Sequence, residues 1–140
     1  MDTNFGRSLE CQTTAFIEKC RVDKYGESEW VGHGFPNAYL RYDAHYILRN
    51  EEYLGEVLTI ANTSAEDGEL NGEWFMSFLQ HCLSLPTGGV LLEGVYCEEY
   101  RKIVMQFPQV EPLGNYCYLL RRAVVHNSPL FSSGSRQIDS

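Results

Sequence analysis

Basic residues are scarce in this sequence. Its 140 residues include 11 Lys and Arg against 19 Asp and Glu, which gives a formal net charge of −8 at pH 7. General affinity for DNA or RNA arises when Lys and Arg neutralise phosphates and displace their counterions. The scarcity therefore argues against direct nucleic-acid binding, and it makes a basic protein the more plausible macromolecular partner.

Long apolar runs are also missing. No run approaches the roughly 20 residues that a membrane-spanning helix needs. The N-terminal stretch MDTNFGRSLE lacks the apolar segment of a signal peptide. We therefore expect a protein that does not enter a membrane, located in the cytoplasm or in a particle assembled there.

Paired cysteines are absent as well. The five cysteines, at positions 11, 20, 82, 97 and 117, are odd in number and include no Cys-x-x-Cys pair. This pattern indicates reduced, mostly buried thiols and neither a disulfide framework nor a zinc knuckle. A nucleophilic Cys97 is the alternative for one of them, but the adjacent Glu98 and Glu99 oppose a thiolate.

The histidines show no metal-ligand spacing. His45, His81 and His126 are scattered along the chain, so we expect no bound metal. His33 lies between two glycines in GHGF and is predicted as a loop histidine. An exposed imidazole for acid and base work is the alternative there.

The remaining composition is that of one folded domain. Hydrophobic residues make up 44% of the chain and aromatic residues 13%, with nine Tyr, which favours broad half-buried sheet surfaces. At this length one core can form, burying about two thirds of the unfolded chain's surface. We expect a loose N-terminus over residues 1–8, a single domain over 9–126 and a flexible tail over 127–140.

In the first half of the domain, apolar spacing predicts a short helix over residues 9–20. Its core-facing residues are Leu9, Phe16, Ile17 and Cys20. Residues 21–37 contain three glycines and one proline, which predicts a loop with one short strand around Trp30. We expect this loop to pack onto the domain through Trp30 and Phe35.

A hairpin is predicted next. From Tyr39 to Arg49 apolar and polar residues alternate, which is the period of a half-buried strand. Residues 53–61, YLGEVLTIA, form a partner strand after the short turn RNEE. So short a connection favours antiparallel pairing, with Ile60 in a central position.

The second half predicts two helices and two strands. Apolar residues from Trp74 to Leu85 recur at helical spacing, with Asn71 as a candidate N-cap. The run VLLEGVYC, residues 90–97, predicts a strand covered on both faces and parallel to a neighbour. A second helix is expected within CEEYRKIVMQF, and a last strand over residues 115–125. The fold class is α/β or α+β, a mixed and mainly antiparallel sheet flanked by two main helices.

This order of elements resembles the core of the GNAT family of N-acetyltransferases. The likeness covers roughly Tyr39 to Val125 and lies in the order and spacing of the elements. It implies acetyl-coenzyme A as cofactor, held by backbone groups of a strand and of the turn before a helix. The cofactor-binding residues would be Ile60, Ala61, Asn62, Gly68 and Gly72. The catalytic candidates are Tyr100, which would protonate the departing thiolate, and Glu56 or Glu93 as a general base.

One motif departs from the family pattern. The family's turn usually carries Q/R-x-x-G-x-G/A, whereas the stretch EDGELNGEW has two glycines but no Arg, Lys or Gln. Glu66, Asp67, Glu69 and Glu73 crowd the turn, and each carboxylate opposes a phosphate by about 1 kcal/mol in water. A helix N-terminus offers only about half a positive charge. The turn therefore disfavours a pyrophosphate.

Two functions remain open at this point. One is an acyl-coenzyme A dependent N-acyltransferase. The other is a catalytically inactive GNAT-like module, accessory or viral, whose acids bind a basic protein or imitate a phosphate backbone. The acids in question are Glu51, Glu52, Glu56, Glu66, Asp67, Glu69 and Glu73. A strand through Ile60 that splays from its neighbour favours the enzyme, whereas aromatic side chains filling that slot argue against it.

Overall fold

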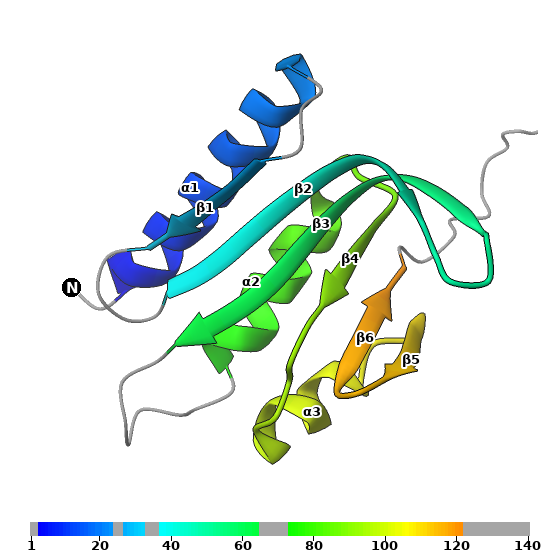
Figure 1. The fold of residues 1–140 in the computed structure, drawn as a ribbon. Helices are drawn as coiled ribbons and strands as arrows, with labels where there is room; N and C mark the ends of the chain where they lie inside the picture. The colour runs from blue at the N-terminus through cyan, green and yellow to red at the C-terminus, as the bar shows by residue number, and fades with distance from the viewer. Residues whose placement is uncertain (1–2, 24–26, 33–36, 65–72, 122–140) are drawn as a thin grey trace, which may run out of the picture.

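A computed structural model describes residues 3–23, 27–32, 37–64 and 73–121 (Figure 1). These residues form a single α+β domain with three helices and one six-stranded sheet. The helices are α1 (Thr3–Asp23), α2 (Glu73–Ser84) and α3 (Glu98–Val104). The strands are β1 (Glu27–Val31), β2 (Asn37–Ile47), β3 (Tyr53–Ser64), β4 (Gly89–Leu92), β5 (Val110–Gly114) and β6 (Cys117–Leu120).

The sheet is mixed and mainly antiparallel, as predicted. Its strand order is β1-β2-β3-β4-β6-β5. Only β3 and β4 pair in parallel, and α2 connects them, whereas β2 and β3 form the predicted antiparallel hairpin. All four residues of β4 are buried, which confirms a strand covered on both faces.

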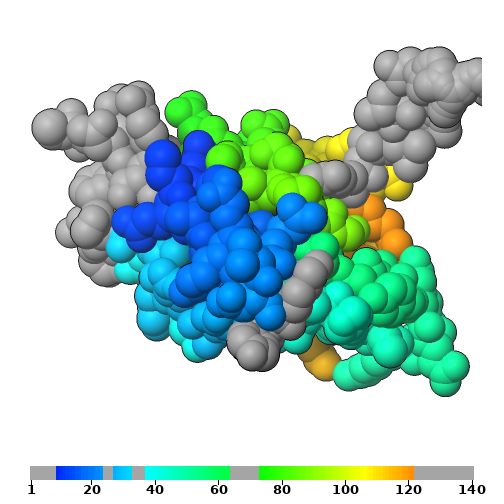
Figure 2. Space-filling model, turned by 90° about the horizontal axis from the view of Figure 1, so that it is seen from above, coloured from blue at the N-terminus to red at the C-terminus, as the bar shows by residue number. Residues whose placement is uncertain are grey.

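The helices cover one face of the sheet. Figure 2 shows α1 and α2 side by side, with the β2–β3 hairpin extending beyond them. Their apolar faces form the main core with one face of the central strands, and α3 adds Tyr100, Ile103 and Val104 to it. We call this face the helix side and the opposite face the hairpin side. A smaller cluster on the hairpin side contains Leu48, Val57, Leu91 and Leu119.

Helix α1 is longer than predicted and begins at Thr3 rather than near residue 9. The four residues expected to face the core are all buried. Thr13 fits inside the helix because its hydroxyl donates a hydrogen bond to the Leu9 carbonyl at 2.8 Å. Helix α2 follows its predicted periodicity, with Phe75, Phe78 and Leu79 buried.

The expectation that Trp30 anchors its segment in the domain is wrong. Trp30 is 53% exposed, and its ring contacts that of Tyr39, at 5.1 Å between centroids. The reason is strand alternation, because β1 buries the next residue, Val31, and so turns Trp30 to the other face. Phe35 and His33 lie outside the described residues.

The C-terminal part differs from the prediction in three places, the first being that β6 begins at Cys117 rather than at residue 115. Strand β4 ends at Leu92 rather than at residue 97, and Gly94 follows with φ +65°. Strand β5 was not predicted as a separate strand, since Pro112 suits only an edge position such as the one it occupies here. It joins β6 through Asn115 and Tyr116, both at positive φ, as in a two-residue hairpin turn. The tail prediction for residues 127–140 lies outside the described part.

Candidate functional site

Strands β3 and β4 separate at Ile60. Their parallel pairing runs from Val57 opposite Gly89 to Ile60 opposite Leu92. A last hydrogen bond joins Glu93 N to the Ile60 carbonyl at 3.1 Å. Beyond this bond β3 continues to Ser64, whereas the segment after β4 turns at Gly94 towards α3. Such a splay of the strand through Ile60 is the arrangement expected of the enzyme.

A β-bulge lies at the same point. Leu40 pairs with Ile60 but Tyr39 pairs with Asn62, so β3 has one more residue here than β2. The extra residue is accommodated around Ala61. Bulges bend a strand and redirect its side chains, and they are over-represented next to active sites. The bulge and the splay together therefore open the sheet on one side of β3.

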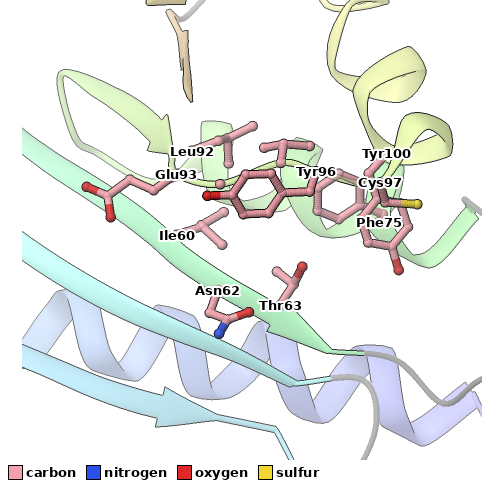
Figure 3. A pocket seen from close by; sticks show the side chains of 11 residues that line it. Ile60, Asn62, Thr63, Phe75, Leu92, Glu93, Tyr96, Cys97 and Tyr100 are labelled. Carbon is pink, nitrogen blue, oxygen red and sulfur yellow. The ribbon is translucent and has the colours of Figure 1, made fainter. Parts of the chain in front are cut away.

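A pocket of about 220 Å³ occupies the opening on the helix side (Figure 3). We call it the helix-side pocket. It brings together Ile60, Asn62, Glu93 and Tyr100 from the predicted set, although they come from β3, the end of β4 and α3. Three elements thus supply one site.

Tyr100 forms part of the wall of this pocket. Its ring stacks on Phe75 with centroids 4.2 Å apart, and Trp74 Nε1 donates to its hydroxyl at 3.2 Å. Burial raises the pKa of Tyr100 above that of an ordinary tyrosine. The phenol is therefore protonated at neutral pH, as a proton donor must be. These aromatic rings line the pocket but leave its volume open.

Glu93 lies at the other end of the helix-side pocket. Its two oxygens accept hydrogen bonds from the Arg41 guanidinium at 3.1 and 2.7 Å, and this pairing raises the pKa of Arg41. Both side chains remain more than a third exposed. Glu93 is thus an oriented carboxylate that solvent and ligands can reach.

Glu56, the other candidate base, does not line the helix-side pocket. Its Oε1 accepts hydrogen bonds from Arg21 Nε at 2.8 Å and from the Tyr42 hydroxyl at 3.0 Å. It precedes Ile60 by four residues of extended chain, which is about 13 Å along β3. Burial, followed by the bond to Glu56, raises the pKa of Tyr42 to about 12. Glu56 thus ties β3 to α1 and β2, away from the pocket.

The other predicted residues divide into two groups. Ala61 lies in the bulge beside the pocket lining, whereas Gly68 and Gly72 lie outside the described residues. Sequence reasoning missed Thr63, and it missed Tyr96, which is 71% exposed at the pocket rim. The sequence did contain a signal for Tyr96. A glycine after an apolar run, here Gly94, can end a strand and turn the following residues across the sheet.

The predicted acidic surface is spread out where the structure describes it. Glu52 precedes the first residue of β3, and Glu73 begins the helix that follows its end. The two carboxylates thus lie on different elements, with the 12 residues of β3 between them. Glu52 and Glu56 are also already paired with Arg121 and Arg21. Glu66, Asp67 and Glu69 lie outside the described residues.

Within the described ranges, no three His, Cys, Asp or Glu side chains come together as metal ligands. None of the helices described is long and apolar enough to cross a membrane.

Comparison of the chain with protein-family models, with curated proteins and with solved structures finds no match.

Proposed function

We propose that this chain is a GNAT-like N-acyltransferase that transfers an acyl group from an acyl-coenzyme A to an amine. The observation that carries the proposal is the pocket at the point where the parallel strands β3 and β4 separate. The order of elements supports it too, since an antiparallel pair leads through α2 to a parallel strand, a helix and a closing hairpin.

The groups around the pocket suit the chemistry of acyl transfer. When the coenzyme is bound, it supplies a thioester carbonyl. The C–N bond to the amine forms as the C–S bond breaks, so the amine must lose a proton and the departing sulfur must gain one. Glu93 takes the proton of the amine, directly or through one water, and Tyr100 donates its phenolic proton to the thiolate. Beyond Ile60, β3 stays paired with β2, but its edge towards β4 has no strand partner among the described residues and is available to the pantetheine amides.

The phosphates of the coenzyme fit this chain less well. Helix α2 begins at an exposed Glu73, and the sequence puts three further acids in the preceding eight residues. Repulsion from these carboxylates weakens as salt screens it. We therefore expect recognition of the acyl-pantetheine end to dominate, with an affinity that does not fall as salt rises.

The test is isothermal titration with acetyl-coenzyme A and with S-acetylpantetheine at low and moderate salt. Micromolar binding of the first, with the second within about tenfold, or 1.4 kcal/mol, supports the proposal. Thr63→Trp fills the pocket and abolishes both signals, while Lys102→Gln, on the exposed side of α3, leaves them unchanged. No heat and no thermal shift at millimolar coenzyme would reject the transferase and favour the acidic binding module, for which a pull-down with basic proteins is the direct test.

A further inference from the structure

A second pocket, of about 390 Å³, lies on the hairpin side of the sheet. We call it the hairpin-side pocket. The end of the β2–β3 hairpin forms one wall with Leu48 and Arg49, the β5–β6 hairpin forms the other with Glu111 and Leu113, and β4 forms the floor through Leu91. Its size and its apolar floor with a few polar groups are those of small-molecule sites.

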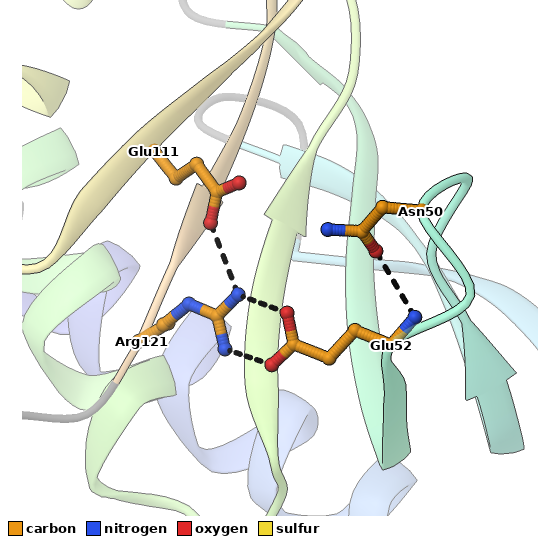
Figure 4. Close-up of polar contacts among 4 residues, drawn as sticks. All are labelled: Asn50, Glu52, Glu111 and Arg121. Carbon is orange, nitrogen blue, oxygen red and sulfur yellow. Dashed lines mark hydrogen bonds and ion pairs between the residues drawn. The ribbon is translucent and has the colours of Figure 1, made fainter.

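The two walls are tied together by one arginine. Arg121 donates two hydrogen bonds of 2.9 Å to Glu52 in the hairpin wall and one of 3.0 Å to Glu111 in the other wall (Figure 4). The turn before Glu52 is fixed as well, because Asn50 Oδ1 accepts from the Glu52 amide at 3.0 Å. The pocket is therefore preorganised rather than a gap between loose hairpins.

The charges of the lining select a ligand. Each of its two carboxylates has one arginine partner outside the pocket, Arg121 for Glu111 and Arg41 for Glu93, but Glu93 stays more than a third exposed and can still accept a hydrogen bond from a ligand amine. Arg49 is exposed and has no ion-pair partner among the described residues. It is thus the unbalanced charge of the lining, and it suits a carboxylate on a ligand whose body is apolar enough for Leu48, Leu91 and Leu113.

Glu93 connects the two pockets. It lines both of them, although the helix-side pocket contains Leu92 and the hairpin-side pocket contains Leu91, on opposite faces of β4. A ligand amine on the hairpin side would therefore meet the same carboxylate that borders the proposed thioester site. We propose that the hairpin-side pocket binds the acceptor and that this acceptor is an apolar amino acid, with its carboxylate on Arg49 and its amine at Glu93. The role of acceptor rests on the proposed function, whereas the amino-acid site does not.

The test uses the full chain without coenzyme. L-leucine is titrated by calorimetry alongside 3-methylbutylamine, which has the same side chain and amine but no carboxylate. Leucine should bind at least tenfold more tightly than the amine, and Arg49→Gln should remove that advantage. The matched control is Lys102→Gln, an equal loss of charge on exposed α3, which leaves leucine binding within twofold. Circular dichroism verifies that each variant is folded.

The outcomes separate this inference from the proposed function. Equal binding of leucine and 3-methylbutylamine, an Arg49→Gln variant that binds leucine normally, or no leucine binding at millimolar concentration would each overturn the amino-acid site, even if acetyl-coenzyme A binds. If leucine binds as expected but acetyl-coenzyme A does not bind, the amino-acid site is upheld and its role as acceptor site is rejected. If both bind, mass detection of N-acetylleucine upholds the acceptor role, and its absence rejects it.

Discussion

The helix side and the hairpin side of the sheet are held by different kinds of contact. On the helix side, Leu40, Leu58 and Phe78 are fully buried in one continuous apolar core. On the hairpin side the apolar cluster is small, and arginine pairs such as Arg41 with Glu93 and Arg121 with Glu52 span the strands. The same strands thus face a mainly apolar layer on one side and a polar, partly exposed layer on the other.

The difference separates stability from chemistry. Apolar burial contributes about 25 cal/mol per Å², whereas exposed ion pairs contribute about 0–1 kcal/mol each. The helix side therefore stabilises the fold, and the hairpin side can carry charged groups for recognition. The two pockets meet where these layers meet, at the end of β4.

The largest expected effect comes from truncating the same residue type on the two sides. Leu58→Ala, in the main core, should cost about 4 kcal/mol, and Leu48→Ala, in the small cluster near the turn, about 2 kcal/mol. Both residues are buried, but only Leu58 is surrounded by helices and strands that cannot relax into the cavity. Urea unfolding measures both losses. Equal losses would show that the two layers stabilise the domain alike.

If the chain is the proposed acyltransferase, removing the hydroxyl of Tyr100 should lower kcat and leave coenzyme binding intact. Tyr100→Phe keeps the stack on Phe75 but deletes the proton donor, so we expect about a hundredfold lower kcat. Acetyl-coenzyme A should bind within about twofold, since no binding contact of the pocket wall is lost. Tyr53→Phe, at an exposed residue that lines neither pocket, serves as control. An unchanged kcat in single-turnover transfer assays would exclude Tyr100 as the acid.

A smaller effect is expected where β4 enters the sheet. A Cβ at Gly88 would lie 2.3 Å from the backbone oxygen of Leu54, whereas one at Gly89 would meet a side-chain methyl of Leu119 at 3.2 Å. Gly88→Ala must therefore move backbone and should cost about 1–3 kcal/mol. Gly89→Ala should cost less, because a side chain can shift. Thermal unfolding of both variants tests this, and a tolerated Gly88→Ala would mean that the β3–β4 pairing adjusts easily.

The sequence predicted the elements with strong periodicity. Helix α2, the β2–β3 hairpin and the buried strand β4 follow directly from apolar spacing, because burial on one or two faces dictates that spacing. It did not predict the exposure of Trp30, which depends on which residue of an edge strand faces the core. Strand β5 was also missed, since a short strand with Pro112 resembles a loop unless its edge position is known.

The sequence predicted several residues of the candidate site but not the shape of the pocket that they line. Ile60, Asn62, Glu93 and Tyr100 meet in one pocket, while Glu56 belongs to another group. The bulge near Ala61 is set by the register between two strands, which no local pattern encodes. The hairpin-side pocket depends on contacts across 69 residues, from Arg121 to Glu52, and such a tertiary contact has no sequence signature.

The smallest expected effect concerns the Arg121 clamp and its pH dependence. The hydrogen bonds from Arg121 hold the pKa of Glu52 below its ordinary value of 4.5. A carboxylate with a lowered folded-state pKa stabilises the fold at pH values above its unfolded pKa and loses that contribution as the pH falls through its folded pKa. Arg121→Gln should therefore lower the Tm slightly at pH 7 and make no difference in strong acid, and high salt should shrink the difference at pH 7 because the pair is exposed. Glu52→Gln should reproduce both trends, whereas Lys102→Gln should show neither. A Tm difference that persists in strong acid would mean that Arg121 acts through packing of its stem, and the two walls of the hairpin-side pocket would then be joined by apolar contact rather than by charge.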